Sequence, residues 1–262
     1  MGNLFLNDCI NRLKEITGKK YIYFTSRGNS SIKEALKYAR ENFETIYYPD
    51  QAGWMTYKQF AEKYNFKINT IKTDIGLIEN NYFKNVNKKA CLLFNSMPAY
   101  AFNINVDNLN FKGLIINDVS GSIGSIGSNK GDFLVGSFGR WKPINLGGGG
   151  FIATDFDDFK IDNNLELDFE KLLIKLNNLE NRLNFIKTIR GKVKNDLKNF
   201  EILYPVHDGL NVIVKFNDDI EKEKLINYCL ENNLEYVLCP KDIRVNIDAI
   251  SIEIKRLDEN KK

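Results

Sequence analysis

Residues 113–125 read GLIINDVSGSIGS: an apolar strand delivers Asp118 at its carboxyl end into a loop of small residues. Outward from this point, the first two-thirds of the chain alternates short apolar runs with helical patterns, which indicates a mostly parallel sheet covered by helices. In doubly wound sheets the ligand crevice lies at the carboxyl ends of the strands. Asp118 is therefore well placed to bind a ligand, although an isolated aspartate at such a position more often only caps its loop.

The part of the chain before residue 160 contains seven candidate strands, at residues 21–25, 45–49, 66–71, 90–95, 113–119, 133–138 and 150–154. Helices are expected over about 30–42 and 56–64, where apolar residues recur at three- and four-residue steps after a Ser or Thr. The 17 residues between the strands at 90–95 and 113–119 leave little room for a full crossover helix.

The later part of the chain changes to a long amphipathic stretch, which predicts a long helix broken near Gly191. A strand, a helix and two further strands are expected after it, at 210–216, 219–233, 234–240 and 242–247. We therefore expect two domains: a large α/β domain over residues 1–164, and a long helix with a small α+β domain over residues 165–262.

Composition argues against several classes of function. The 37 basic residues are nearly balanced by 34 acidic ones, so the chain lacks the charge expected for binding nucleic acid or an anionic membrane. No stretch approaches the roughly 18 apolar residues that span a bilayer, and the start lacks a signal-peptide pattern, so we expect a cytoplasmic protein. A metal site is not expected, because His207 is the single histidine and the cysteines lack zinc-site spacing; they should be reduced and mostly buried (Cys9, Cys91, Cys229 and Cys239).

A helix start that could bind phosphate follows the first predicted strand, in TSRGNSSIKEAL (25–36). The strand ends at Thr25, a glycine follows, and Asn29, Ser30 and Ser31 lead into the helix. Such a start presents backbone N–H groups and the positive end of the helix dipole to an anion. Asn and Ser also occur at helix starts for purely structural reasons, so both interpretations stay open.

A lysine follows the strand at 133–138, in GSFGRWKPINLGGGGFIAT (136–154). Lys142 lies between Trp141 and Pro143 and precedes a run of four glycines. A lysine desolvated in an apolar turn becomes a nucleophilic amine, whereas a solvated lysine beside a flexible loop would have no such role. Four glycines cost folding entropy and are easier to explain if a ligand or a neighbouring backbone approaches closely. The glycines follow the lysine, which argues against a Walker-type phosphate loop.

Taken together, these segments resemble the pyridoxal 5′-phosphate (PLP)-dependent sugar aminotransferases of the DegT/DnrJ/EryC1/StrS family, within the fold-type I enzymes. In that family a strand ending in Asp is followed by small residues, then by Ser-Phe, three residues and the cofactor-binding lysine, then by a glycine-rich turn and a strand ending in Thr. Here the matching residues are Asp118, Ser137, Phe138, Lys142 and Thr154. The resemblance implies a PLP-transferase-like large domain with a mostly parallel sheet, a long connecting helix and a small α+β C-terminal domain.

The resemblance also implies roles for individual residues. Lys142 would be the Schiff-base lysine and would shuttle a proton, and Asp118 would hold the pyridine nitrogen of PLP protonated. Ser137 would donate to the cofactor phosphate, and Trp54 would stack on the pyridine, although a core-packing role for Trp54 stays open. The full set of implied cofactor-binding residues is Gly28, Asn29, Ser30, Trp54, Asp118, Ser137 and Lys142.

Two arginines are candidates for binding substrate. Arg244 resembles the strand arginine that grips a carboxylate in many fold-type I enzymes, and Arg140, beside the lysine, could bind an anionic group. For both, a solvated surface side chain is the alternative.

The sequence departs from the family in two places. No counterpart of the Gly-x-Asn-x-Arg segment precedes the long helix, where TDFDDFKIDNNLELD (154–168) stands instead. Gly121 occupies the position, three residues after the aspartate, where the family commonly has Gln or His. These departures weaken the inference about the substrate more than the inference about the cofactor.

The function implied by the resemblance is a homodimeric, PLP-dependent aminotransferase-like enzyme that moves an amino group from a small-molecule donor, such as glutamate, to a keto acceptor, keto sugars included. One alternative is a divergent PLP-binding protein with a non-transaminase or regulatory role. Another is an α/β domain in which Lys142 contacts a phosphate or nucleotide without a covalent bond. Partners among nucleic acids, membranes and metals are not expected.

Overall fold

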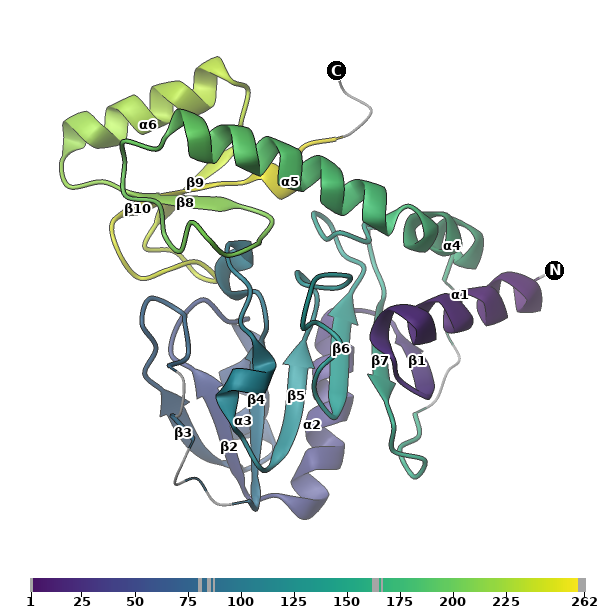
Figure 1. Ribbon diagram of the computed structural model, residues 1–262. Helices are drawn as coiled ribbons and strands as arrows, with labels where there is room; N and C mark the ends of the chain where they lie inside the picture. The colour runs from purple at the N-terminus through teal and green to yellow at the C-terminus, as the bar shows by residue number, and fades with distance from the viewer. Residues whose placement is uncertain are drawn as a thin grey trace.

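A computed structural model describes residues 2–79, 82–83, 86, 88–161, 165 and 167–258. It contains a seven-stranded sheet with helices on both faces and a three-stranded sheet that lies above it in Figure 1. The expectation of an α/β fold with a mostly parallel sheet and a small α+β unit near the C-terminus is confirmed. No helix in the described ranges is both long and apolar enough to cross a membrane.

The large sheet has the strand order β1-β7-β6-β5-β4-β2-β3. Its strands are β1 (Tyr21–Thr25), β2 (Thr45–Pro49), β3 (Lys67–Ile71), β4 (Ala90–Asn95), β5 (Leu114–Asp118), β6 (Phe133–Ser137) and β7 (Gly150–Thr154). Each lies within one residue of its predicted bounds. β7 is antiparallel to both of its neighbours, and all other pairs are parallel. The carboxyl ends of β1, β5 and β6 therefore share one edge of the sheet with the amino end of β7.

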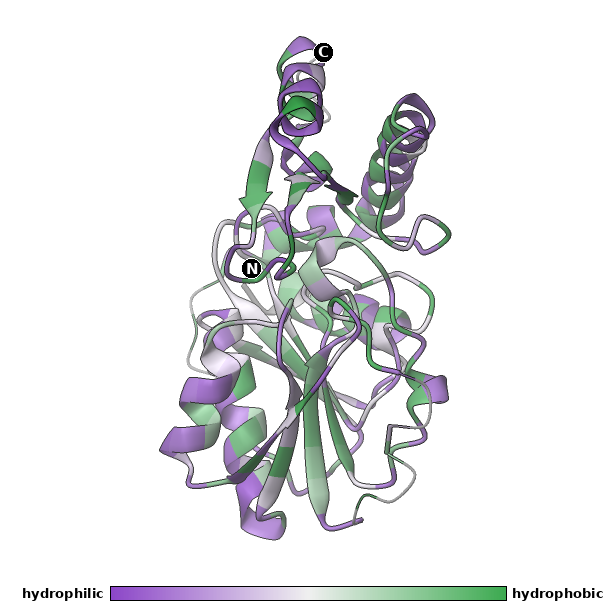
Figure 2. Ribbon diagram, turned by 90° about the vertical axis from the view of Figure 1, so that its left-hand side faces the viewer, coloured by the Kyte–Doolittle hydropathy of each residue, from purple (hydrophilic) through white to green (hydrophobic). Residues whose placement is uncertain are grey.

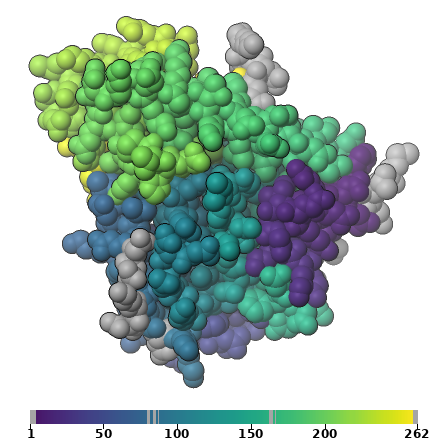
Figure 3. Space-filling model, viewed as in Figure 1, coloured from purple at the N-terminus to yellow at the C-terminus, as the bar shows by residue number. Residues whose placement is uncertain are grey.

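Helices cover the two faces of this sheet with their apolar sides. α2 (Gly28–Asn42) and α3 (Thr56–Lys63) lie on one face, where Ile32 and Leu36 of α2 pack against Leu93 and Ile116 of the sheet. The other face is covered by α1 (Gly2–Thr17) and α4 (Phe169–Asn177), which also pack against each other (Figure 3). Figure 2 shows the resulting layers, with hydrophobic strands inside and the hydrophilic sides of the helices outside.

The connection between β4 and β5 contains no α-helix, as its length predicts. It forms two short 3₁₀ turns, η1 (Pro98–Tyr100) and η2 (Val106–Leu109). Apolar side chains of this connection, among them Ile104 and Leu109, pack against Leu92 and Phe94 and take the place of a helix on that part of the sheet. The turn η1 consequently lies close to the carboxyl end of β4.

The predicted break of the long helix near Gly191 is wrong. The helical region divides at Asn178 into α4 and α5 (Leu179–Asp196), and α5 continues through Gly191. A single glycine costs a helix only about 1 kcal/mol relative to alanine, which tertiary contacts readily offset. One such contact is next to it: the buried guanidinium of Arg190 donates hydrogen bonds to the backbone carbonyls of Ala101, His207 and Asn211.

The C-terminal unit comprises β8 (Val212–Lys215), α6 (Asp219–Glu231), β9 (Tyr236–Cys239), β10 (Ala249–Ile252) and the 3₁₀ turn η3 (Ile254–Arg256). Its antiparallel sheet has the order β8-β10-β9. The strand predicted at 242–247 is wrong: these residues form turns, and the third strand is β10. Ile243 has a φ of +58°, which an extended strand cannot accommodate. The boundary expected between residues 164 and 165 falls where residues 162–164 and 166 lie outside the described residues.

Candidate active site

A cavity of about 170 Å³ lies at the shared carboxyl ends of β1, β5 and β6. This is the edge at which parallel α/β sheets bind ligands. Its lining residues are Arg27, Gly28, Asn29, Ile32, Trp54, Tyr100, Asp118, Ser120, Ser137 and Lys142. The cavity thus brings together six of the residues that the sequence predicted, from Gly28 to Lys142. Ser30 and Arg140 lie outside its lining, and Arg244 lines a second cavity next to it.

Asp118 is the acidic group of the cavity. It ends β5 and is 7% exposed. The phenol of Tyr57 donates to its Oδ2 across 2.8 Å, and the backbone N–H of Ser120 donates to its Oδ1 across 3.0 Å. Two directed hydrogen bonds fix the orientation of this buried carboxylate.

Lys142 is the basic group of the same cavity. Its Nζ donates a hydrogen bond to the phenol oxygen of Tyr100. The ammonium also lies 4.3 Å from the centre of the Tyr100 ring and 5.5 Å from the centre of the Trp54 ring. Aromatic faces attract a cation at such distances, so the two rings hold the amine inside the cavity.

The start of α2 forms the end of the cavity suited to an anion. Arg27 is the N-cap residue, and it makes no side-chain capping hydrogen bond in the described part of the chain. The N–H groups of Ser30 and Ser31 donate to the carbonyl of Arg27, which leaves those of Gly28 and Asn29, in the described part of the chain, for an external acceptor. Gly28 follows, and a Cβ atom there would lie 2.7 Å from Cβ of Ser137. Only glycine allows α2 to begin this close to the end of β6.

Asn29 and Ser30 are placed differently from one another. The side chain of Asn29 accepts a hydrogen bond of 2.6 Å from Nε1 of Trp54, so it fixes the indole at the cavity wall. Ser30 lies outside the cavity lining; its hydroxyl is 3.0 Å from that of Ser26, and its N–H donates to the carbonyl of Arg27. A phosphate contact through the Ser30 side chain would therefore require a change of rotamer.

The glycine run after Lys142 allows the close backbone approach that its composition suggested. A Cβ atom at Gly150 would lie 2.6 Å from the carbonyl oxygen of Gly136 and 2.9 Å from the carbonyl carbon of Arg27. Gly147 and Gly149 have φ values of +87° and +89°, which other residues rarely adopt. The loop can thus turn from β6 into β7 beside the start of α2.

Two residues in contact with Lys142 have strained backbones. Tyr100 and Trp141 both have a φ of +61°, in the left-handed region that bulky residues avoid, and Ala99 has a φ of +51°. Such conformations cost about 1–3 kcal/mol each and tend to occur at functional sites. Trp141, with its ring 4.4 Å from the guanidinium of Arg256, precedes the lysine directly.

Arg244 is buried and paired within the protein. It lies in the turn before β10, where its Nε and Nη2 bind the two carboxylate oxygens of Glu253 at 2.8 and 2.7 Å. Lys255 binds the same carboxylate. Burial alone would raise the pKa of Glu253, but these cations outweigh it and lower it to about 2. A substrate carboxylate would have to compete with Glu253 for Arg244.

The remaining predicted arginine, Arg140, is exposed at the surface of the loop before Lys142. It lies outside the cavity lining.

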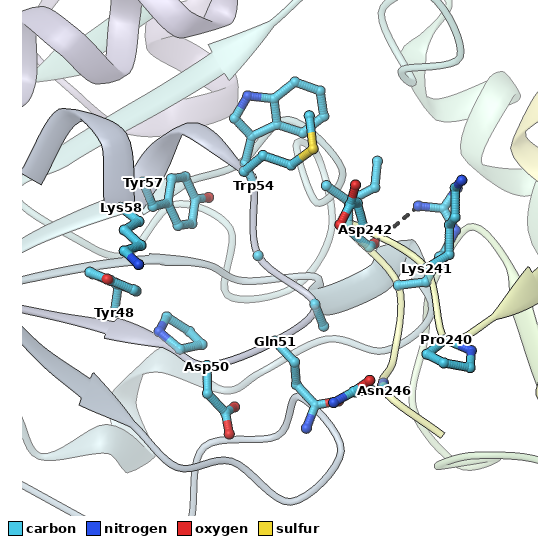
Figure 4. Close-up of a pocket in the computed structure, with 16 residues that line it drawn as sticks. Tyr48, Asp50, Gln51, Trp54, Tyr57, Lys58, Pro240, Lys241, Asp242 and Asn246 are labelled. Atoms are coloured by element: carbon cyan, nitrogen blue, oxygen red, sulfur yellow. Dashed lines mark hydrogen bonds between the residues drawn. The ribbon is translucent and has the colours of Figure 1, made fainter. Parts of the chain in front are cut away.

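A second cavity of about 450 Å³ adjoins the first at Trp54. Figure 4 shows its two walls: Tyr48 of β2, Asp50 and Gln51 of the loop after it, and Lys58 of α3 face Pro240, Lys241, Asp242 and Asn246 of the C-terminal unit. The walls are joined by a hydrogen bond of 2.8 Å from the N–H of Asn246 to the side chain of Gln51. Acidic and basic side chains both line this larger cavity.

Five lining or supporting residues were missed from the sequence: Arg27, Ile32, Tyr57, Tyr100 and Ser120. Tyr57 lies in the first turn of α3, three residues after Trp54, which lies in the loop before that helix. Tyr100 follows the carboxyl end of β4, at the edge where the ligand crevice was expected. Of these, only the position of Tyr100 was a signal in the sequence, and it did not distinguish a site from core packing.

The amino-acid sequence matches no family model and no curated protein. The fold, in contrast, matches solved structures of PLP enzymes. GDP-4-keto-6-deoxy-D-mannose-3-dehydratase from E. coli, with bound hydrated PLP, has a TM-score of 0.74 and 12% identity over 97% of this chain and 88% of that chain. NtdA from Bacillus subtilis, with bound PMP, has a TM-score of 0.71 and 13% identity over 95% and 72% of the two chains.

Serine palmitoyltransferase from S. paucimobilis, with a bound PLP–myriocin aldimine, has a TM-score of 0.70 and 13% identity over 98% of this chain and 73% of that chain. At these identities the likeness establishes architecture: the chain has the fold of the fold-type I PLP enzymes, as expected. The proteins that share it carry different names and reactions, so the reaction has to be argued from the site.

Proposed function

We propose that this protein is an enzyme that binds PLP and transfers an amino group from an amino-acid donor to a keto substrate, keto sugars included. One observation carries the proposal. The carboxylate of Asp118, at the end of β5, and the amine of Lys142, in the loop after β6, line one small cavity. A PLP site needs an amine for the aldehyde and an acid for the ring nitrogen in a shared space.

The remaining groups of the cavity fit the same cofactor. When bound, PLP supplies an aldehyde that links to amines and a ring that accepts electrons. Asp118, oriented by Tyr57 and Ser120, would pair with the ring nitrogen. Trp54, fixed by Asn29, would stack on the ring. The N–H groups at the start of α2, with Arg27 and Ser137 beside them, would hold the phosphate.

The larger adjoining cavity is the proposed site of the keto substrate. It shares Trp54 with the cofactor cavity and offers both amide and charged side chains, which suit a hydroxyl-rich sugar. Solved structures with this fold support the substrate classes. One GDP-4-keto-6-deoxymannose-3-dehydratase contains a trapped PLP–glutamate geminal diamine, and another contains GDP-perosamine.

Three further expectations belong to the proposal. Fold-type I enzymes place the site at a subunit interface, so we propose a homodimer, which sedimentation analysis would test. We propose that the enzyme acts in the cytoplasm. We also retain the division into residues 1–164 and 165–262 as the two folding units.

The cofactor assignment is tested by trapping a covalent bond between PLP and Lys142. Purified chain incubated with PLP and reduced with borohydride should carry a pyridoxyl group on Lys142, located by peptide mass spectrometry. Lys142→Ala should lose the group, and Lys58→Ala should keep it, because Lys58 lies outside the cofactor cavity. A wild-type chain without the adduct would refute the assignment and favour the noncovalent phosphate-binding alternative.

The test of the reaction uses glutamate. Glutamate added to the PLP-loaded chain should change its absorbance spectrum and release one 2-oxoglutarate for each bound PLP that is converted. If PLP is bound at Lys142 and no amino donor produces this conversion, the protein is the divergent PLP-binding alternative and the transaminase assignment is wrong.

A further inference from the structure

Tyr100 touches the one amine that the proposed function requires. Its phenol oxygen accepts the hydrogen bond from Nζ of Lys142, and among the described residues this is the hydrogen bond that the structure gives to that nitrogen. The Ser137 hydroxyl, which also lines the cavity, accepts from the N–H of Gly139 instead. The phenol is therefore the hydroxyl group that is placed to exchange a proton with Lys142.

The position of Tyr100 is fixed from several sides. Its ring lies against Gly121, where a Cβ atom would approach Cδ1 of Tyr100 to 2.7 Å. Its carbonyl oxygen accepts two hydrogen bonds of 2.8 Å, from the N–H groups of Leu210 and Asn211. The strained φ of +61° is thus held by packing on one side and by the C-terminal unit on the other.

Positive charges surround this ring. Lys255 lies 4.6 Å and Arg244 lies 5.5 Å from its centre, in addition to Lys142 at 4.3 Å. The only carboxylate that the structure shows bound to Lys255 and Arg244 in the described ranges is Glu253. These cations lie on the aromatic faces of Tyr100, and their attraction to the ring helps to hold it against Lys142, in the cavity that Asp118 also lines.

We propose that Tyr100 is the proton carrier of Lys142, a proposal that rests on the proposed function. Before Nζ can attack an aldehyde carbon, the ammonium must lose one proton. In one concerted step the phenol oxygen accepts that proton from Nζ while the phenol gives its own proton to solvent. Lys142 loses one proton, solvent gains one, and Tyr100 ends as it began.

The first test compares Tyr100→Phe with wild type. The full-length chain, freed of cofactor, is mixed with PLP, and the adduct on Lys142 is trapped by borohydride at successive times and quantified. Positioned proton transfer contributes about 10²–10⁴-fold to a rate, so the variant should form the adduct about 100-fold more slowly. Its rate should also rise more steeply with pH than that of wild type, because hydroxide must remove the proton instead. An unchanged rate and pH profile would overturn the proposal.

Controls separate this role from a structural one. Tyr23→Phe removes a phenol that donates to the carbonyl of Phe159 across 2.6 Å, away from the cavity, and should leave the rate unchanged. If Tyr100→Phe fails to fold, Gly121→Ala decides, because its Cβ displaces the ring and keeps the phenol; slow adduct formation supports the proposal, and a wild-type rate overturns it.

A second readout needs no cofactor. Trinitrobenzenesulfonate modifies free lysine amines, and its rate at Lys142 is measured relative to the exposed Lys58 in the same chain. Tyr100→Phe should lower this ratio, and an unchanged ratio counts against the role of Tyr100. If wild type forms no adduct with PLP while Tyr100→Phe still lowers this ratio, the proposed function is refuted and the proton exchange between Tyr100 and Lys142 is retained.

Discussion

The phenol of Tyr57 donates a hydrogen bond of 2.8 Å to Oδ2 of Asp118 and so joins the first turn of α3 to the carboxyl end of β5. Burial, with the negative charge of Asp118, raises the pKa of Tyr57 well above its usual value. The phenol therefore remains protonated and keeps donating across the physiological range. Asp118 is oriented by a neighbour that does not change its own charge.

Tyr57→Phe should weaken PLP binding with little change in fold. A hydrogen bond to a charged group contributes about 1.5–3 kcal/mol, so the dissociation constant should rise by about tenfold or more. Titration of cofactor absorbance measures it. Tyr38→Phe is the matched control, since Tyr38 donates to Asp158 across 2.9 Å on the surface, and it should bind PLP as wild type does. Equal affinities for both variants would show that Tyr57 does not act on the site.

Gly28→Ala should damage both the fold and the site. The new Cβ would lie 2.7 Å from Cβ of Ser137, so the start of α2 or the end of β6 must move. Overpacking of this kind costs about 1–3 kcal/mol, and both displaced segments line the cofactor cavity. Denaturant unfolding and PLP titration should both reveal the loss.

The same substitution elsewhere should act in the opposite direction. Gly191 lies within α5 with no atom in contact range of an added Cβ, so Gly191→Ala should stabilise the chain by about 1 kcal/mol and leave PLP affinity unchanged. If Gly28→Ala and Gly191→Ala had equal free energies of unfolding, the close contact described at Gly28 would be contradicted.

Arg244→Met should destabilise the chain strongly. Removing one partner of a buried pair costs at most about 3–5 kcal/mol, and the fully buried Glu253 would lose both of its hydrogen bonds from Arg244 and keep Lys255 as its close cation. Arg12→Met, which breaks an exposed pair with Glu15, should cost less than about 1 kcal/mol. Should Arg244→Met keep its stability and lose affinity for the amino donor, Arg244 would be a substrate ligand after all.

Lys255 should make stability depend on pH. Burial lowers its pKa from 10.5 to about 7 in the folded chain, against the raising effect of Glu253. Between these values the unfolded chain binds more protons, so the free energy of unfolding rises with pH through this group. The difference between wild type and Lys255→Met, measured in urea, should therefore grow in favour of wild type from about pH 7 to about pH 10. A difference that shrinks over this range would contradict the assignment.

Local patterns in the sequence predicted most of the fold. Each apolar run of the large sheet became a strand, because runs such as residues 90–95 are too short and too uniformly apolar for a surface helix. The errors came from tertiary context. Packing carries α5 through Gly191, and the burial of Arg244 with Glu253 turns residues 242–247 away from a strand. Neither pairing can be read from local periodicity.

The candidate site was predicted in part for the same reason. Asp118, Ser137 and Lys142 follow strands whose carboxyl ends must meet, so their convergence was foreseeable. Tyr57 and Tyr100 act through contacts with residues far along the chain, and a tyrosine by itself indicates core packing as readily as a site. Their roles required coordinates.

The carbonyl of Tyr100 is held by Leu210 and Asn211, and the carbonyl of Ala101 by Arg190. The backbone next to Lys142 is thus held in place by residues that are synthesised about a hundred residues later. The C-terminal third is for this reason not an interchangeable module. A chimera that joins a homologous C-terminal third to this sheet would have to supply its own donors to those two carbonyls. Without them Tyr100 would no longer be held in position to accept the hydrogen bond from Lys142.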